Sequence, residues 1–538
     1  MVASARPTPQ PGPAALRGIK WTTAVAVATA VLQVGYTSVM ARLLDPGAFG
    51  LVALAGVVLR FGTYFAGLGL DRALVQRAAL SDTDVQASFT ASLATGVAVA
   101  AAFWALAPLA VLVLDDAAVV PLIRALALGF VVSAWGLPAQ SLLRRAMRFE
   151  TLAKVEISCY VLSYGGVGLG SAWLGAGVWS LVAANVSQQL FNSVADYAIV
   201  RHSLRPVRGW QPYRALLGYG SQVSLLSFQE FVIGSLDTVL IGRQLGAGPL
   251  GFYNRAYMLV YLPMYFLTNS VGRVAFPAFS QVQHELPRLR ELYQRSCTLV
   301  AALVLPLCAG VAVAAPQLVR VMLGPRWAPA GPVLAALCLA VPLAMLNSFG
   351  VILADVRANL RPKFWLNVQF CLLLLALFWL LRGYGIVGVA LATGLAELGR
   401  TALYMRLTGH DLGLSYTSQL QQYGPGLRNA AGVALAIGAT TAALRGLAWP
   451  PLLLFGAQLL AGAGALAALL LAWPLPELRP GLRALLTRAQ AHPTLPAWCR
   501  PTLQRYAARL APTPLADTTL ADAEQLTAPP ALEVVVSR

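Results

Sequence analysis

Long apolar runs, separated by short polar stretches, dominate the chain from residue 18 to residue 473. A run of about 20 apolar residues can cross the hydrocarbon core of a bilayer as a helix. We predict fourteen such helices. The first twelve lie near residues 18–41, 47–70, 87–113, 118–140, 152–173, 177–199, 215–241, 249–272, 294–315, 331–353, 364–382 and 385–407, and the last two near 428–446 and 451–473.

A short stretch occurs twice, each time between two apolar runs. Residues 41–50, ARLLDPGAFG, align without a gap to residues 242–251, GRQLGAGPLG, and Arg42 and Arg243 stand 201 positions apart. Six predicted helices separate the two copies. Because six is an even number of crossings, corresponding helices of the two halves run in the same direction, and such parallel repeats are related by an axis along the membrane normal. The chain is therefore predicted to be an all-α polytopic membrane protein with two pseudo-symmetric six-helix lobes and two additional helices.

The predicted organisation has five parts. They are a disordered cytoplasmic N-terminus at 1–15, an N-lobe at 16–204, a C-lobe at 205–410, the last two helices at 411–474 and a partly disordered cytoplasmic tail at 475–538. The two ends are rich in Pro and Ala, a composition that does not bury enough apolar surface to order itself.

Basic residues indicate the orientation of these helices. Most arginines and the three lysines fall in alternate loops, beginning with the N-terminus. The opposite loops hold only Arg42, Arg243, Arg320, Arg326, Arg382 and Arg445. Because cytoplasmic loops carry the excess of Lys and Arg, both termini are predicted to be cytoplasmic. The stretch 140–156 mixes apolar and basic residues, a pattern typical of helices that lie on anionic lipid headgroups. The same residues fit ordinary topology anchors at the ends of spanning helices, and we favour that role.

Composition agrees with a membrane protein and argues against several other classes. The chain is 58% hydrophobic and 11% charged, with a mean hydropathy of +0.67, whereas soluble domains carry about a quarter charged residues. The net charge of +18 follows the loops and does not indicate nucleic-acid binding. The six cysteines are scattered and the four histidines lie in predicted loops or the tail, so we expect no metal site. No nucleophile–base pair or phosphate-binding glycine loop is present, so we expect neither an enzyme nor a cofactor.

Charged residues inside apolar runs are the first candidates for function, because they usually face an aqueous cavity or a partner. Our short list of such residues is Arg60, Glu230, Asp237, Arg255 and Glu397. Glu230 and Asp237 are seven residues apart and share one helix face. The acidic residues are candidates for binding a coupling H+ or Na+ ion, or for tuning the arginines. The alternatives are that Arg60 pairs with Glu230 or Asp237 to join the halves, that Arg255 extends to the interface, and that Glu397 forms a local pair with the nearby Arg400.

The repeat extends this set to polar and aromatic residues. Gln33 and Tyr36 in the first helix match Gly234 and Asp237 in the seventh. Helices 1, 2, 7 and 8 are therefore expected to surround a central cavity. The candidate substrate-binding residues are Arg60, Arg255, Gln33, Tyr36, Tyr64, Tyr257 and Tyr261. Tyr257 and Tyr261 belong to a stripe at four-residue spacing that also fits an aromatic packing seam.

Four arginines stand at the predicted ends of the repeated helices. Arg42 and Arg243 lie at the outer end, and Arg72 and Arg273 at the inner end. As residues of a cavity mouth they would attract an anionic headgroup. Equally, they would cap helix C-termini, where a cation interacts favourably with the helix dipole.

Several stretches resemble the Wzx-type polysaccharide transporters, which are lipid-linked oligosaccharide flippases of the multidrug/oligosaccharidyl-lipid/polysaccharide exporter superfamily. They are ARLLDPGAFGLVALA, LGLDRALVQR and PAQSLLRRAMRFETLAKVEI in the first half, and DTVLIGRQLGAGPLGFYNRAYMLVYLP, VAFPAFSQVQ and VMLGPRWAPAGPVL in the second. The resemblance covers roughly residues 15–410.

This resemblance implies two lobes around a cavity that opens alternately to either side of the bacterial cytoplasmic (inner) membrane. It implies a polyprenyl-diphosphate-linked glycan as substrate, moved from the cytoplasmic to the periplasmic leaflet for cell-surface polysaccharide biosynthesis. Other polysaccharide assembly proteins are then candidate partners, and the two additional helices would form a groove for the lipid tail.

Three other functions remain open from the residues. A peptidoglycan lipid-precursor flippase would share most of these features. An ion-coupled drug exporter of the same superfamily would favour an acidic, aromatic cavity, which two cavity arginines disfavour. A membrane-embedded glycan polymerase or ligase would need a large outer loop, whereas the longest here spans about residues 316–330.

Overall fold

The computed structural model describes residues 13–66, 74–75, 80–206, 225–447 and 449–474, and the described part of each predicted apolar run is almost entirely helical. The predictions for residues 1–12 and 475–538 lie outside this range. The N-terminal half contains α1 (Pro13–Leu43), α2 (Pro46–Ala66), α4 (Asp82–Leu106), η1 (Ala107–Leu109), α5 (Ala110–Leu114), α6 (Val119–Arg145), α7 (Phe149–Tyr160), η2 (Val161–Gly168), α8 (Leu169–Trp173) and α9 (Val178–Val200).

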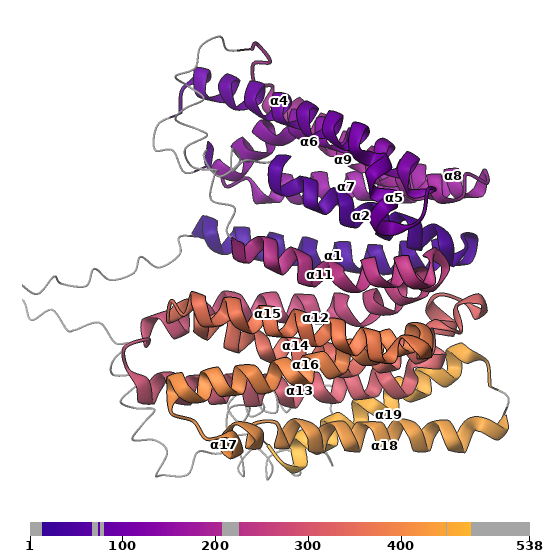
Figure 1. The fold of residues 1–538 in the computed structure, drawn as a ribbon, viewed down its shortest axis with the longest axis vertical. Helices are drawn as coiled ribbons and strands as arrows, with labels where there is room; N and C mark the ends of the chain where they lie inside the picture. Colours follow the sequence, from indigo (N-terminus) through magenta and orange to yellow (C-terminus); the bar gives the residue numbers. More distant parts are fainter. Residues whose placement is uncertain (1–12, 67–73, 76–79, 207–224, 448, 475–538) are drawn as a thin grey trace, which may run out of the picture.

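The remaining helices repeat this pattern and then add to it. They are α11 (Leu225–Leu245), α12 (Ala247–Gln281), α13 (Leu286–Met322), η3 (Pro325–Trp327), α14 (Ala330–Val356), α15 (Leu360–Leu381), η4 (Arg382–Tyr384), α16 (Gly385–Leu412), α17 (Tyr416–Gln421), α18 (Gly424–Leu444), η5 (Arg445–Leu447) and α19 (Pro451–Ala472). Helices α1–α9 form one lobe and α11–α16 the other, while α18 and α19 pack on α13 at the outer side of the second lobe (Figure 1).

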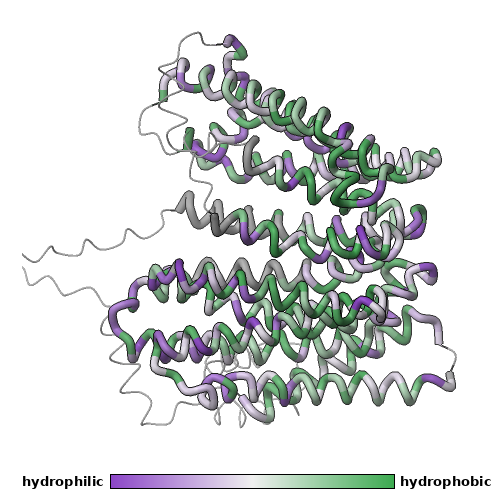
Figure 2. Tube along the Cα trace, in the orientation of Figure 1, coloured by the Kyte–Doolittle hydropathy of each residue, from purple (hydrophilic) through white to green (hydrophobic). Residues whose placement is uncertain are grey.

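Eight helical stretches among the described residues are long and apolar enough to cross a membrane. Hydrophobic residues dominate the long helices, and many of the hydrophilic ones gather near the helix ends (Figure 2). The chain is thus an all-α, multi-pass membrane protein, as predicted. The number of fourteen crossings stays a prediction.

Local sequence signals explain several helix boundaries. Pro46 begins α2 and Pro451 begins α19, because a proline at the first helical position lacks only an N–H group that has no helical partner. Ser81 and Asp84 form a capping box at the start of α4, in which each side chain accepts a hydrogen bond from the backbone N–H group of the other.

The stretch 140–156, whose pattern is typical of headgroup-binding helices, is not a separate surface helix. Residues 140–145 end α6 and residues 149–156 begin α7, with a turn between them in which Met147 has a φ of +54°. The apolar residues of this stretch continue the two spanning helices, so the amphipathic pattern arises from two helix ends.

The two lobes meet through a backbone contact that uses both copies of the repeated stretch. A Cβ atom on Gly50 of α2 would overlap the carbonyl group of Ala247 at the start of α12. A Cβ atom on Gly251 of α12 would overlap the carbonyl group of Pro46 at the start of α2. Since 201 positions separate both Pro46 from Ala247 and Gly50 from Gly251, the contact is reciprocal. Only glycine permits helix backbones to approach this closely, so the repeat specifies the crossing point of the lobes.

Two arginines reinforce this junction, again reciprocally. Arg42, at the end of α1, donates a hydrogen bond from Nη2 to the carbonyl oxygen of Val321 (2.9 Å), near the end of α13 in the other lobe. Arg243, at the end of α11, donates from Nη1 to the carbonyl oxygens of Leu112 (3.3 Å) and Val113 (3.4 Å), near the end of α5 in the first lobe. Of the two roles that the sequence left open, these contacts are those of helix C-terminal caps. Each arginine caps a helix of the opposite lobe.

Trp327 of η3 completes the junction from the C-lobe side. Its side chain is fully buried, and Nε1 donates a hydrogen bond to the carbonyl oxygen of Ala41 (2.7 Å). Its ring packs edge-on against Phe49 of α2 (5.4 Å between centroids) and Phe252 of α12 (5.6 Å). This tryptophan therefore ties the first helix of one lobe to the crossing of α2 and α12.

Two glycine-to-alanine substitutions in α2 should change stability in opposite directions. Gly50→Ala places a methyl group against the backbone of α12 and should lower the thermal unfolding temperature in detergent. Gly56→Ala meets nothing within 4 Å and should raise stability by about 0.5–1 kcal/mol, because alanine loses less backbone entropy in a helix. Equal effects of the two substitutions would contradict the proposed role of Gly50 at the crossing.

Candidate functional site

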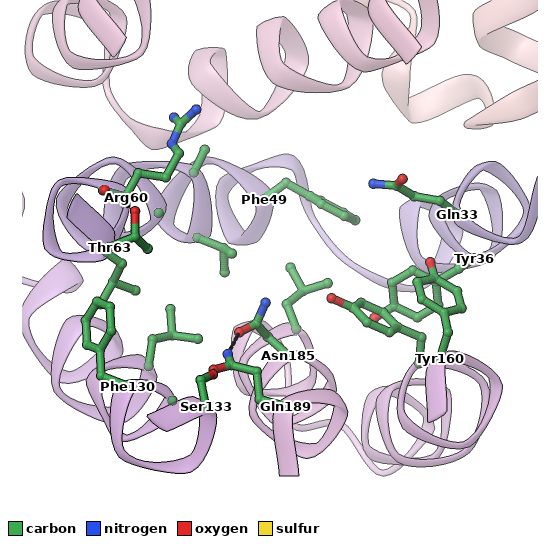
Figure 3. A pocket seen from close by; sticks show the side chains of 18 of the residues that line it. Gln33, Tyr36, Phe49, Arg60, Thr63, Phe130, Ser133, Tyr160, Asn185 and Gln189 are labelled. Carbon is green, nitrogen blue, oxygen red and sulfur yellow. Dashed lines mark hydrogen bonds between the residues drawn. The ribbon is translucent and has the colours of Figure 1, made fainter. Parts of the chain in front are cut away.

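A cavity of about 700 Å³ lies within the N-lobe. Helices α1, α2, α6, η2 and α9 surround it, and Asn254 and Arg255 of α12 border it from the C-lobe. Figure 3 shows Gln33 and Tyr36 on one side, Arg60 and Thr63 on another, and Asn185 and Gln189 across from them. Of the predicted helices 1, 2, 7 and 8, the first, second and eighth contribute to this cavity as α1, α2 and α12, whereas no described residue of α11 lines it.

An aromatic wall forms where the fifth predicted span departs from α-helical geometry. Residues Val161–Gly168 adopt a π-helix, and such segments occur frequently at functional sites. Tyr160 and Tyr164 stack at 4.5 Å between ring centroids, and Tyr36 of α1 packs edge-on against Tyr164 at 4.8 Å. All three tyrosines line the cavity.

The facing wall is built from carboxamides and a hydroxyl. Ser133 of α6 donates a hydrogen bond to Oε1 of Gln189 (2.7 Å). Gln189 in turn donates from Nε2 to Oδ1 of Asn185, one turn earlier on α9 (2.8 Å). Gly129 makes room for this arrangement, because a Cβ atom there would overlap the Gln189 carboxamide.

Two arginines border the cavity in different environments. The guanidinium of Arg255 lies 4.7 Å from the centre of the Phe49 ring and donates from Nη2 to Oδ1 of Asn254 (2.5 Å). It therefore joins the lobes through a cation–π contact. Arg60 is exposed and, among the described residues, forms no ion pair with Glu230 or Asp237, so the predicted alternative of an ion pair joining the halves does not occur.

Three polar atoms at this cavity lack hydrogen-bond partners. They are Oη of Tyr36, Oη of Tyr160 and Nε of Arg255, all enclosed by protein. Buried polar groups are normally paired, and an unpaired one costs roughly 1–3 kcal/mol. A ligand that supplies hydrogen-bond acceptors could satisfy all three groups, because each of them can donate a hydrogen bond.

The three predicted acidic residues lie away from this cavity, and each has partners of its own. Asp237 accepts hydrogen bonds from Tyr253 Oη (2.8 Å) and from the backbone N–H of Thr238 (2.6 Å). Glu230 lies 3.5 Å from Lys363 Nζ. Glu397 accepts from Arg400 (3.3 Å), which agrees with the expected local pair, and from Asn347 Nδ2 (2.9 Å).

Some of the other predicted residues line the N-lobe cavity and others do not. Tyr257 and Tyr261 are stacked at 4.9 Å between ring centroids in α12 and do not border the N-lobe cavity, and their role in binding stays a prediction. The side chains of Tyr64 and Arg273, and all of Arg72, lie outside the described residues. Gln33, Tyr36, Arg60 and Arg255 do line the cavity, while their role in binding stays a prediction.

Sequence reasoning missed the contribution of α9. This helix carries Asn185, Gln189, Asn192 and Asp196 at spacings of three and four residues, which place them on one face. The signal is visible in the sequence as a polar stripe through an apolar run. The stripe lies outside the repeated stretch, and Asp196 is not among the charged residues selected above as candidates.

Comparisons with known proteins identify the family. Residues 39–332 match a family described as "Polysaccharide biosynthesis protein". The chain belongs to this family. It is similar to the lipopolysaccharide biosynthesis protein WzxC of Escherichia coli K12, with 26% identity over 413 residues that cover 74% of this chain and 82% of WzxC. It is also similar to the succinoglycan biosynthesis transport protein ExoT of Rhizobium meliloti, with 30% identity over 324 residues that cover 60% of this chain and 65% of ExoT.

Among solved structures, the lipid II flippase MurJ in an inward closed conformation shares the fold. Its TM-score is 0.61 at 13% identity, with 84% of this chain and 97% of MurJ covered. These similarities confirm the resemblance to the Wzx-type polysaccharide transporters and the two-lobed fold that it implied. ExoT is described as a transport protein, so the comparison gives no support to the polymerase or ligase alternative and agrees with the expectation that the chain is not an enzyme.

Tyr36→Phe and Ser133→Ala each remove one hydroxyl at this site. Their effects on stability should differ, because the Tyr36 hydroxyl is unpaired and the Ser133 hydroxyl donates a hydrogen bond. Tyr36→Phe removes an unpaired hydroxyl and should leave the thermal stability of the ligand-free protein unchanged or higher. Ser133→Ala removes the donor to Gln189 and should lower stability by about 0.5–1.5 kcal/mol. Thermal unfolding in detergent checks both, and a large loss of stability in Tyr36→Phe would mean that its hydroxyl is already paired.

Proposed function

We propose that this protein moves a polyprenyl-diphosphate-linked oligosaccharide from the cytoplasmic to the periplasmic leaflet of the bacterial inner membrane. The observation that supports this most directly is the N-lobe cavity with its unpaired Tyr36, Tyr160 and Arg255 atoms. Sugars offer many hydroxyl oxygens as acceptors, and their ring faces pack against aromatic side chains. Membership of a polysaccharide biosynthesis family supports the choice of a glycan.

The physical task is to carry a charged, hydrated headgroup through hydrocarbon. Such a group does not cross unaided, because losing its hydrogen bonds to water costs several kcal/mol per polar group. Asn185, Gln189 and Ser133 would replace water around the sugars. Arg60 and Arg255 would bind the diphosphate through charge-assisted hydrogen bonds.

Movement between the leaflets would follow from the way the lobes are joined. The described contacts at the α2–α12 crossing, the Arg42 and Arg243 caps and Trp327 all lie at the end of the bundle that holds the α1–α2 and α11–α12 connections. The distribution of basic residues predicts that this end faces the periplasm. Opening there requires these contacts to separate, as expected for the rocking of two lobes.

A reconstitution experiment tests this function. The purified chain in vesicles should expose a labelled polyprenyl-diphosphate oligosaccharide, added to one leaflet, to a membrane-impermeant enzyme on the other side. Arg255→Gln should reduce the rate at least about tenfold, since a hydrogen bond to a charged group contributes ~1.5–3 kcal/mol. Arg288→Gln, which changes an exposed arginine paired with Glu285, is the matched control and should retain the rate.

The choice of substrate determines how the result is read. Movement of lipid II at a rate equal to or above that of polysaccharide precursors would favour the peptidoglycan alternative. Movement of an organic cation in place of either lipid would favour the drug-exporter alternative. Full activity of Arg255→Gln on the oligosaccharide lipid would contradict the assigned role of Arg255.

A further inference from the structure

A second cavity of about 410 Å³ lies in the N-lobe, beyond the first along the polar face of α9. Both cavities use α1, α6 and α9, but the second begins where α9 continues towards its C-terminus. Its polar lining residues are Gln140 and Arg144 of α6, Glu156 of α7, and Gln188, Asn192 and Asp196 of α9. The end of the lobe that holds them is predicted to be cytoplasmic.

Two acceptor oxygens at this cavity have no donor. They are Oδ1 of Asn192 and Oδ1 of Asp196, both enclosed by protein and without a hydrogen-bond partner. Asp196 is only 3% exposed. Because residues four apart on a helix are neighbours, the two side chains lie one above the other on the same face. A buried carboxylate oxygen without a donor is strongly unfavourable unless a proton or a cation reaches it.

The charges of the described lining residues favour a cation over an anion as ligand. One cation, Arg144, borders the cavity together with two carboxylates, Glu156 and Asp196, and no ion pair joins them within the described part of the chain. The titratable groups that face Asp196 are Arg144 from α6, and Glu156 and Cys159 from α7. Gln140 and Gln188 add carboxamide oxygens to the lining. Among the described lining residues, oxygen acceptors predominate and two carboxylates outnumber one arginine.

We propose that this cavity binds a small monovalent cation, a proton or a sodium ion, between the Oδ1 atoms of Asp196 and Asn192. A proton on Asp196 would turn its carboxyl group into a donor to the Asn192 carboxamide oxygen. A sodium ion would instead be held by both oxygens and by the neighbouring carboxamides. Either cation satisfies the two unpaired acceptors at once. The acidic residues predicted for a coupling ion are elsewhere, in the C-lobe, where protein groups already hydrogen-bond or pair with them.

The position of the site suggests what the cation does. Asn192 and Asp196 continue the face of α9 that carries Asn185 and Gln189 into the first cavity. A cation would bind at one end of this face and a glycan at the other. The affinity for each would therefore depend on how α9 is placed within the lobe. This coupling rests on the proposed function, whereas cation binding itself does not.

Binding measurements on the purified full-length chain, in detergent and without any lipid-linked glycan, test the site. Radiolabelled sodium binding reports the sodium form, and infrared difference spectra between two pH values report the carbonyl band of a protonated carboxylic acid. Asp196→Asn should lower sodium affinity at least about tenfold, or abolish the acid band. Glu150→Gln is the matched control, because Glu150 is an exposed carboxylate of α7 paired with Lys154 and outside the cavity.

The possible outcomes either identify the bound cation or overturn the proposal. Sodium binding that is lost in Asp196→Asn and kept in Glu150→Gln identifies sodium, whereas an acid band with the same dependence and no sodium binding identifies a proton. Neither signal in the native chain, or signals unchanged by Asp196→Asn, would overturn the proposal. Asn192→Ala keeps the carboxylate and should also weaken the signal, which guards against a folding defect of the first variant. A chain that binds the cation but moves no glycan would refute the proposed function alone.

Discussion

The contact between the backbones of α2 and α12 is the constraint on which the rest of the structure depends. Gly50 lies against the carbonyl group of Ala247, and Gly251 lies against that of Pro46. Neither helix can approach the other so closely with a side chain at these positions. The contact is reciprocal because both glycines occupy the same place in the repeat. It determines where the two lobes touch and, with it, which parts of each lobe are left to form cavities.

The other features of the junction follow from this crossing. Arg42 and Arg243 reach carbonyl groups at the ends of helices in the opposite lobes, and Trp327 fills the space beside Phe49 and Phe252. Arg255, three residues beyond Phe252, is carried to the edge of the N-lobe cavity and lies over the Phe49 ring. The close approach of the lobes thus places the guanidinium group of Arg255, from the C-lobe, at the polar cavity of the N-lobe.

The two cavities of the N-lobe are bordered by buried polar atoms, one of them from Arg255 of the C-lobe, that no described protein group satisfies. At the first cavity these atoms all can donate a hydrogen bond: they are the hydroxyls of Tyr36 and Tyr160, which also accept, and Nε of Arg255. At the second they are acceptors, the oxygens of Asn192 and Asp196. Because folding does not normally leave such groups unpaired, the two sets indicate ligands of opposite character. Acceptor-rich glycan hydroxyls and phosphates suit the first, and a small cation suits the second.

The sequence by itself determined the membrane class, the positions of the helices and the repeat. Apolar length specifies a spanning helix directly, and the matching of Arg42 with Arg243 needs no knowledge of packing. It also contained Gln33, Tyr36, Arg60 and Arg255 as polar residues in apolar runs. Only the tertiary structure decided which of them share a cavity. Asp237 and Glu397 resemble functional residues in the sequence, yet Tyr253, Thr238, Asn347 and Arg400 already satisfy them. The physical reason is that the partners of a buried polar group come from other helices, and the sequence of one helix does not reveal which neighbours it will meet.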